Sequence, residues 1–272
     1  MKRKSTVGII GCGNMGEAIL AQSKKARIFD FIAYENDAVR ANAIQKKYRV
    51  PLAKDISNLV LRSDIVLIAV KPQDIDSVLD EISAAQTRWK KRAILVVSIA
   101  AGIMTRFIED KLGSDVKVVR AMPNLPAVIG KGITALVKGH FAKDKDLKTA
   151  EKIFASVGET LCITNEEWID AVTAISGSGP AYIFYIVGMI AKTGVQLGLD
   201  EKSANHLIRH TILGSMDLLK EHVYDSDALI AKVKSKGGTT EAALKVFDEE
   251  NLLQIIGKGI KAARDRAREL SR

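Results

Sequence analysis

The sequence predicts an α/β domain, built on a doubly wound and mostly parallel sheet, followed by an all-helical domain. The first half of the chain alternates short β-branched apolar runs with stretches of helical periodicity. A glycine-rich segment separates the first apolar run from the first helix. After about residue 165 strand-like runs disappear and helical spacing continues to the C-terminus. We therefore place two domains at residues 1–164 and 165–272.

Length and composition agree with this organisation. The chain has 272 residues, enough for one large domain or two ordinary ones. Its 47% apolar and 27% charged residues exclude a disordered or low-complexity chain. The chain has two cysteines, Cys12 and Cys162, too few to stabilise a protein of this length through disulfide bonds. We therefore predict a cytoplasmic protein without a disulfide framework. The basic start, Met1–Lys4, lacks the uninterrupted apolar run of a signal peptide.

The strands of the first domain are predicted from apolar runs separated by helix-length segments. The runs at 64–70 and 93–98 are typical of strands that are buried on both faces. Helix-length crossovers indicate βαβ units and parallel neighbours. The predicted strands are 6–10, 31–35, 64–70, 93–98, 116–120, 132–137 and 159–163, and the first predicted helices are 14–26 and 37–48.

The helix that begins near Pro180 is apolar on all sides as far as Ala191. Such a helix must be enclosed, so we predict that a second subunit covers it; the alternative is the central helix of a monomeric bundle. Residues 171–191 carry no charge, but we expect Ser176–Pro180 to interrupt them and leave too few residues to span a membrane. Other breaks are expected near 198–200, 222–226 and 234–239.

The net charge of +9 is scattered in short clusters. Without interleaved aromatic residues or a nucleic-acid motif, these clusters predict solvated faces and no nucleic-acid partner. A positive field would also suit an enzyme with anionic ligands.

The segment Gly11-Cys12-Gly13-Asn14-Met15-Gly16 follows the first predicted strand and opens the first helix. Gly11 permits the tight turn, Gly13 lets the backbone approach a pyrophosphate, and Gly16 lets helix and strand pack closely. The helix N-terminus then offers free N–H groups to the phosphates. The pattern predicts a Rossmann-like dinucleotide site; a purely structural turn is the alternative.

Glu35 lies at the end of the second predicted strand, where a carboxylate accepts hydrogen bonds from the adenosine ribose. This position favours NAD over NADP. The next predicted helix contains three cations that could bind a 2′-phosphate: Arg40, Lys46 and Lys47. The sequence therefore leaves NAD and NADP open.

The chain shows no Ser-His-Asp arrangement that we can assemble. The four histidines are His140, His206, His210 and His222. His206 and His210 are one helical turn apart, but a pair without a third ligand predicts a solvated face, so we expect no metal site. The chemistry is therefore assigned to a nicotinamide.

A second glycine pair lies near the C-terminus, in Lys234-Ser235-Lys236-Gly237-Gly238-Thr239-Thr240, before a predicted helix. Backbone N–H groups and two hydroxyls converge there, so a carboxylate would fit. The alternative is a plain loop with Thr240 as the helix N-cap.

Taken together, these motifs resemble those of the Δ1-pyrroline-5-carboxylate reductase family over essentially the whole chain. The motifs that carry the resemblance are Gly11–Gly16, Ala69-Val70-Lys71-Pro72-Gln73, Arg120-Ala121-Met122-Pro123-Asn124, Ser176-Gly177-Ser178-Gly179-Pro180-Ala181-Tyr182 and Gly237–Thr240.

The resemblance implies hydride transfer from NADH or NADPH to the C=N bond of pyrroline-5-carboxylate, giving L-proline in the last step of proline synthesis. It implies a Rossmann domain followed by a helical dimerisation domain, a homodimer or larger oligomer, and a substrate pocket at the dimer interface. It places the catalytic hydroxyl on Thr240, with Ser235, Gly238 and Thr239 binding substrate. The implied cofactor contacts are Gly11, Cys12, Gly13, Asn14, Met15, Gly16, Glu35, Ala69, Val70, Lys71, Pro72, Ser98, Ala100 and Gly102.

The chain departs from the family pattern at two positions. Lys236 stands where many members have Pro, and Glu35 stands where NADPH-preferring members often have a small polar residue. Lys71 either touches the phosphates or caps a strand. Two rival functions remain: a β-hydroxyacid dehydrogenase, for which Lys192 is the nearest candidate general acid, and a non-catalytic dinucleotide-binding protein.

Overall fold

The computed structural model describes residues 3–85, 94–113, 115–221 and 225–271. They form two compact units, one of Met1–Ser178 with Ala263–Arg272 and the other of Gly179–Ala262. The predicted boundary at residues 164/165 stays a prediction.

The first unit is built on a seven-stranded sheet in the order β2-β1-β3-β4-β5-β6-β7. Every neighbouring pair is parallel except β5 and β6, so the prediction of a mostly parallel sheet is confirmed. The strands are β1 (Thr6–Ile10), β2 (Asp30–Tyr34), β3 (Ile65–Ile68), β4 (Leu95–Ser98), β5 (Lys117–Met122), β6 (Gly132–Lys138) and β7 (Gly158–Cys162). Of the predicted 93–98 strand, residue 93 lies outside the described residues.

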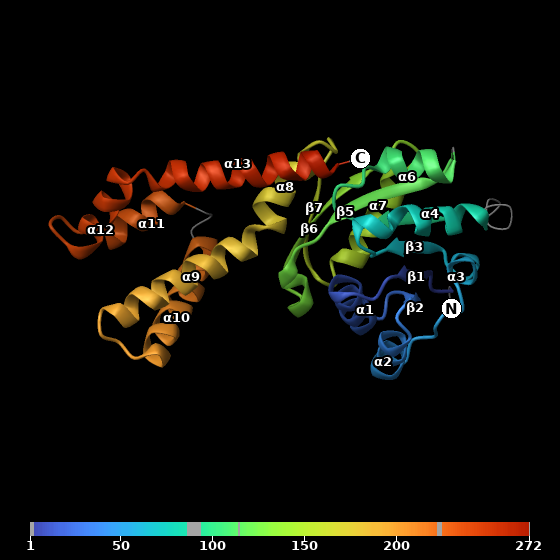
Figure 1. The fold of residues 1–272 in the computed structure, drawn as a ribbon, viewed down its shortest axis with the longest axis horizontal. Helices are drawn as coiled ribbons and strands as arrows, with labels where there is room; N and C mark the ends of the chain where they lie inside the picture. Colours follow the sequence, from blue (N-terminus) through green and yellow to red (C-terminus); the bar gives the residue numbers. More distant parts are fainter. Residues whose placement is uncertain (1–2, 86–93, 114, 222–224, 272) are drawn as a thin grey trace. The chain divides into compact units, whose positions relative to one another are not determined.

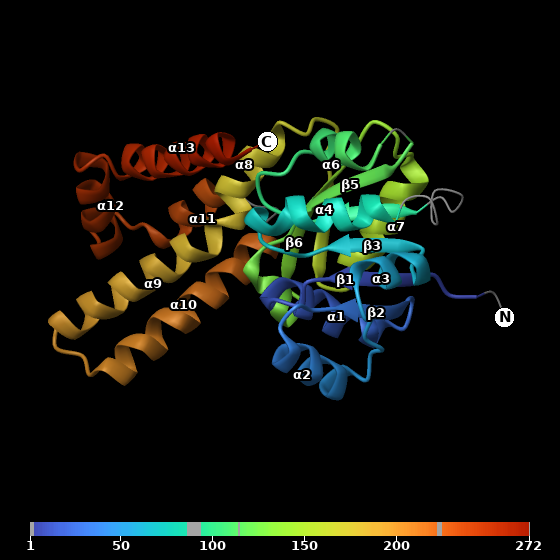
Figure 2. The same ribbon diagram turned by 45° about the vertical axis from the view of Figure 1, so that its right-hand side comes forward.

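Helices cover both faces of this sheet (Figures 1 and 2). Alternate side chains of one strand pack into the apolar clusters on opposite faces of the sheet, as those of Leu67 and Val66 in β3 do. One face packs against α1 (Asn14–Ala26), α2 (Ala38–Tyr48) and α7 (Asp144–Phe154). The other packs against α3 (Ile56–Arg62), α4 (Ile75–Ala84) and α6 (Thr105–Leu112). Two 3₁₀ turns, η1 (Pro72–Asp74) and η2 (Leu125–Ile129), follow β3 and β5.

The predicted interruption of the helix at Ser176–Pro180 is wrong, because the chain remains helical there apart from one bend residue. Helix α8 (Trp168–Val172) passes into a π-turn, η3 (Thr173–Gly177), and one bend residue separates this turn from α9 (Gly179–Gln196). The Ser178 N–H reaches back to Thr173 O at 2.8 Å, which keeps the chain helical. Within the described residues one helical run, Trp168–Gln196, is long and apolar enough by length and composition to cross a membrane. The expectation that it would be too short is therefore corrected.

The second unit is all-helical, as predicted. After α9 it contains α10 (Glu201–Glu221), α11 (Ser226–Val233), α12 (Thr239–Glu249) and most of α13 (Leu252–Leu270). Ala191 is the one buried residue of α9, and α11, α12 and α13 have none among those described. Within its own unit α9 is therefore not an enclosed central helix, and its cover by a second subunit stays a prediction.

Candidate active site

The glycine loop lies where the direction of chain crossover reverses. β1 lies between β2 and β3 in the sheet, and the loop joins the carboxyl end of β1 to α1. Open α/β sheets bind ligands at such a switch point, outside the carboxyl ends of the strands.

Two glycines of this loop are required by packing. Gly11 has φ +87°, and a Cβ on it would lie 2.9 Å from Ala69 O. A Cβ on Gly16 would collide with the carbonyl oxygen of Gly11. Strand, turn and helix are therefore pressed together as the sequence predicts.

Gly13 has the opposite surroundings. It is the N-cap of α1, where no side chain caps the helix. The nearest atom to a Cβ built on Gly13 is Arg40 Nη1 at 3.9 Å. The first turn of α1, which begins with Asn14 and Met15, thus has an open approach, and this cradle fits the phosphates of a dinucleotide.

Glu35 reaches over the loop from the end of β2. Its Oε2 accepts the Cys12 N–H at 2.7 Å and its Oε1 accepts the Asp37 N–H at 3.1 Å. A carboxylate can accept about four hydrogen bonds, so Glu35 can still accept hydrogen bonds from ribose hydroxyls. Burial, and then the charge of Glu35, raise the pKa of the Cys12 thiol to about 12. Cys12 is thus no nucleophile at neutral pH.

The other predicted cofactor segments line the same sheet edge. Ala69–Pro72 follows β3, where Ala69 N–H donates to Ile10 O at 2.8 Å and the Lys71 side chain is exposed. Ser98 is the last residue of β4 and residues 99–102 follow it, with Ala100 N–H donating to Ser98 Oγ at 3.2 Å. Gly102 has φ +74°, and its Cβ would lie 2.5 Å from Leu270 O, so packing against the end of α13 accounts for this glycine.

Asn124 and Ser176 were not predicted as site residues, yet they join two of the family motifs. Asn124 Nδ2 donates to Ser176 O at 3.3 Å, while its Oδ1 accepts the Ile133 N–H at 3.0 Å. In a regular helix the Ser176 carbonyl would accept from residue 180, but Pro180 has no N–H. Asn124 supplies the missing donor. The proline four residues after Ser176 is the signal that could have revealed this pairing.

A buried ion pair anchors the segment that leads into α8. Arg120 Nη1 lies 3.0 Å from Glu166 Oε1, with the Arg120 side chain 4% and the Glu166 side chain 16% exposed. The same carboxylate accepts the N–H and hydroxyl of Thr105 at the start of α6, at 2.8 and 2.6 Å. Three separate chain segments therefore meet at Glu166.

The late glycine loop precedes α12. The N-cap of α12 is Gly238, so the alternative that made Thr240 the N-cap is wrong. Gly238 N–H donates to Ser235 O at 3.0 Å, which occupies the donor that we had assigned to the substrate. Gly237 N–H donates to Glu241 Oε2 at 2.7 Å, and this bond lowers the pKa of Glu241.

Thr239 and Thr240, which we predicted to bind substrate, are the first two residues of α12. Their backbone N–H groups occupy the first turn of α12, before the first intrahelical bond, from Ala242 N–H to Gly238 O at 3.2 Å. Thr239 is exposed and Thr240 half-buried. Ser235 and Lys236 are exposed beside them.

Three of the four histidines lie in the part of the chain that the structure describes. His206 and His210 lie with ring centroids 4.5 Å apart, and His140 packs edge-on against Phe141. No group of three or more potential ligands occurs among the residues described. His222 lies outside that part of the chain.

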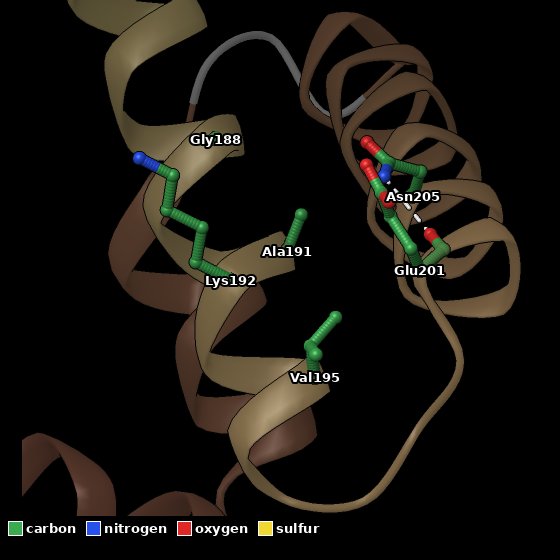
Figure 3. A pocket seen from close by; sticks show the side chains of 6 residues that line it. All are labelled: Gly188, Ala191, Lys192, Val195, Glu201 and Asn205. Carbon is green, nitrogen blue, oxygen red and sulfur yellow. Dashed lines mark hydrogen bonds between the residues drawn. The ribbon is translucent and has the colours of Figure 1, made fainter.

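Lys192 borders a shallow hollow of about 380 Å³ between α9 and α10. Ala191 and Val195 face the hollow, whereas the Lys192 side chain extends away from Glu201 and Asn205 (Figure 3). Asn205 Nδ2 donates to Glu201 O at 2.9 Å. Nothing in this arrangement gives Lys192 the surroundings of a general acid.

Comparison with known proteins decides the family. A model described as pyrroline-5-carboxylate reductase dimerisation matches residues 166–270, and one described as NADP oxidoreductase coenzyme F420-dependent matches residues 6–102. The pyrroline-5-carboxylate reductase of Synechocystis is 36% identical over 98% of each chain. The chain belongs to the pyrroline-5-carboxylate reductase family.

Solved structures of pyrroline-5-carboxylate reductases agree. The Coxiella burnetii reductase superposes with a TM-score of 0.90 at 34% identity, covering 99% of this chain and 100% of that one. The Plasmodium falciparum enzyme, solved with NADP bound, gives 0.86 at 27% identity and 98% coverage of both. Family, fold class and the class of nicotinamide-dependent oxidoreductase are thus confirmed.

Proposed function

We propose that the chain reduces the C=N bond of 1-pyrroline-5-carboxylate to L-proline with NADH or NADPH, the last step of proline biosynthesis. The observation that carries this proposal is the second position of Thr240 in α12. There it is not the helix cap, and its backbone N–H follows that of Thr239 in the first turn of the helix. The backbone N–H groups of a helix start suit a small carboxylate, and the threonine hydroxyls add further donors to this segment.

The N–H groups of Thr239 and Thr240 would bind the substrate carboxylate, with Ser235 beside them. The Thr240 hydroxyl would donate to the ring nitrogen, which favours the protonated imine and then the product amine. The bound reduced nicotinamide supplies the hydride. A protonated imine already accepts hydride readily, so the main contribution of the protein is alignment of the reacting carbons at about 3–3.5 Å.

Residues 1–164 would serve as the dinucleotide domain and 165–272 as the helical dimerisation and substrate domain. The match of the dimerisation model to residues 166–270 supports this division. The exposed apolar side chains of α9 support a homodimer, alone or within a larger ring. We place the enzyme in the cytoplasm, without nucleic-acid or membrane partners.

Replacing the Thr240 hydroxyl tests the proposal. Thr240→Val keeps the β-branched shape and removes the donor, so kcat/KM for pyrroline-5-carboxylate should fall about tenfold to a hundredfold. Thr240→Ser should restore most of it. Oxidation of NADH and NADPH is followed separately by absorbance. Unchanged kcat/KM in Thr240→Val would contradict the catalytic role, and absence of turnover by the wild type would contradict the function.

A further inference from the structure

The last turn of α13 belongs to the unit that contains the predicted cofactor loops. Residues 263–272 group with residues 1–178, whereas the earlier part of the helix belongs to the other unit. Figures 1 and 2 both show the end of α13 beside α8. The predicted site includes no residue of this helix, so its contacts there call for an explanation.

The first of these contacts is with the loop that joins β4 to α6, residues 99–104, here called the β4–α6 loop. A Cβ on Gly102 would lie 2.5 Å from Leu270 O and 3.0 Å from the Leu270 carbonyl carbon. Gly102 also has φ +74°, which glycine adopts without steric cost. The middle of the β4–α6 loop therefore packs directly on the backbone of α13.

The two ends of the β4–α6 loop are held by other groups. Near its start the Ala100 N–H donates to Ser98 Oγ at 3.2 Å. Just after its end, Thr105 donates its N–H and its hydroxyl to Glu166, at 2.8 and 2.6 Å. At Gly102, between these two anchors, the three atoms nearest to a Cβ all belong to the last residue of α13. The end of α13 is thus the support for the middle of the loop.

Asp170 of α8 holds the end of α13 in place. The Ser271 hydroxyl lies 3.2 Å from Asp170 Oδ1 and 3.0 Å from Ala267 O, and the charged carboxylate is the stronger acceptor. Asp170 Oδ2 lies 4.0 Å from Arg268 Nε. The Asp170 side chain is only 14% exposed, and both of these partners come from the end of α13. A carboxylate with so little exposure depends on such partners, so the contact is specific.

The β4–α6 loop lies at the sheet edge where the dinucleotide would bind. β4 is parallel to β3, and β3 to β1, so its carboxyl end shares an edge with the glycine loop. Two of the predicted cofactor contacts, Ala100 and Gly102, belong to this loop. Groups that bind a ligand must be held within about 0.5 Å of their productive positions. Whatever holds Gly102 therefore contributes to cofactor affinity.

We propose that the last turn of α13, held by Asp170, keeps the β4–α6 loop in its cofactor-binding position, so that Asp170 is a positioning residue for the nicotinamide cofactor. This inference rests on the proposed reductase function and adds a residue that acts through the loop rather than on the cofactor itself. Because linkage is reciprocal, cofactor binding must also stabilise the last turn of α13.

Cofactor binding without substrate tests the proposal. NADH and NADPH are each titrated by fluorescence into the full-length wild type, Asp170→Ala and Asp170→Asn. Asp170→Ala should weaken both cofactors about tenfold, because the loop is no longer held in the binding geometry. Asp170→Asn keeps an acceptor for Ser271 and loses only the pairing with the exposed Arg268, so affinity should stay within about threefold of the wild type.

Two further variants complete the test. Ser271→Ala removes the same hydrogen bond from the partner side and should weaken both cofactors severalfold, even if Asp170→Ala does not fold. Glu269→Gln breaks an exposed pair with Arg266 in the same part of α13 and should leave both affinities unchanged. In turnover assays the KM for pyrroline-5-carboxylate should change less than about threefold in every variant, since the substrate groups lie elsewhere.

Hydrogen exchange gives a readout that a merely structural contact would not change. In the wild type, saturating cofactor should slow exchange at residues 266–271 at least about threefold, and this protection should disappear in Asp170→Ala. Unchanged cofactor affinity in Asp170→Ala, an equal loss in Glu269→Gln, or exchange that does not respond to cofactor would each overturn the proposal. Binding is measured without turnover, so a missing reductase activity would contradict the proposed function and leave the Asp170 assignment separately testable.

Discussion

The two glycine-containing loops of this chain are held in different ways. The loop at Gly11–Gly16 lies on a sheet edge where a carbonyl oxygen fills the space that a Gly16 side chain would need. In the late loop, by contrast, nothing lies within 4 Å of a Cβ on Gly237, which has φ +72°. One loop is shaped by packing within its own unit, and the other by turn geometry and a few polar contacts.

The same contrast extends to the units that carry the loops. β1, β3 and β4 are buried on both faces, whereas α11 and α12 bury none of their described residues. The first unit is complete as a single chain. The second carries apolar side chains that are exposed in the single chain, and the homodimer proposed above would cover them.

The largest effect is expected at Gly16. Gly16→Ala forces Gly11 and α1 apart, which displaces the phosphate cradle and should weaken NADH binding about a hundredfold or more. Titration of NADH fluorescence measures this. Gly214→Ala in α10, where nothing lies within 4 Å, should leave NADH affinity unchanged and stabilise the helix by about 0.5–1 kcal/mol. Equal NADH affinities in the two variants would contradict the claim that packing at Gly16 shapes the cofactor loop.

The next effect concerns the exposed face of α9. Phe184 is 61% exposed in the single chain. If a second copy covers it, Phe184→Glu costs at least about 2 kcal/mol, a roughly thirtyfold weaker dimer. Sedimentation equilibrium measures the association. Ile28→Glu, an equally drastic change of an exposed residue in the first unit, should not alter it. Equal dissociation in both variants would refute the assignment of α9 to the interface.

A third effect tests the buried anchor of the first unit. Glu166→Gln leaves Arg120 without its countercharge, and removing one partner of a buried pair costs about 3 kcal/mol. Urea denaturation measures the free energy of unfolding. The matched control, Glu269→Gln, breaks the exposed pair of Glu269 with Arg266 and should change it by no more than about 0.5 kcal/mol. Comparable losses in both would show that burial of the pair contributes nothing.

The smallest effect is a pH dependence at Glu109. Burial raises the pKa of this carboxyl above its usual 4.5, although the N–H groups of Phe141 and His140 oppose the shift. The folded state then binds more protons than the unfolded state between 4.5 and the raised pKa, so stability falls as the pH rises through that interval. Glu109→Gln, which keeps an acceptor for Phe141, should flatten this slope in thermal melts from pH 4 to 7. An unchanged slope would contradict the assignment.

Much of the first unit could be predicted, because period and composition report burial directly. The strand at 6–10 and the helix at 14–26 have the observed bounds. The strand at 64–70 was predicted too long at both ends, because β3 spans Ile65–Ile68 and the apolar Ala69 and Val70 beyond it pack next to Gly11. Glycines, proline and glutamate are informative there because each restricts the backbone or carries a charge.

The conformations of the late glycine loop and of the π-turn were harder to predict from the sequence. The sequence shows Gly237-Gly238-Thr239-Thr240 but not that the Gly238 N–H turns inward to Ser235, because that depends on the φ of Gly237. Likewise Ser176–Pro180 looks like a break, yet Asn124, 52 residues earlier, satisfies the carbonyl that Pro180 leaves without a donor. Contacts between residues far apart in the chain produce no regular spacing of residue types, so the sequence pattern does not reveal them.

The amino-acid sequence by itself determined the alternation of strands and helices, the dinucleotide motif and the family, because these depend on local patterning and on residue types with special backbone or charge properties. The tertiary structure decided which donors remain free and which charges are already paired. Lys47 and Arg40 are equivalent cations in the sequence, but folding brings Glu17 to one and leaves the other beside Gly13. Pairing depends on distances in space, which only the packed chain sets.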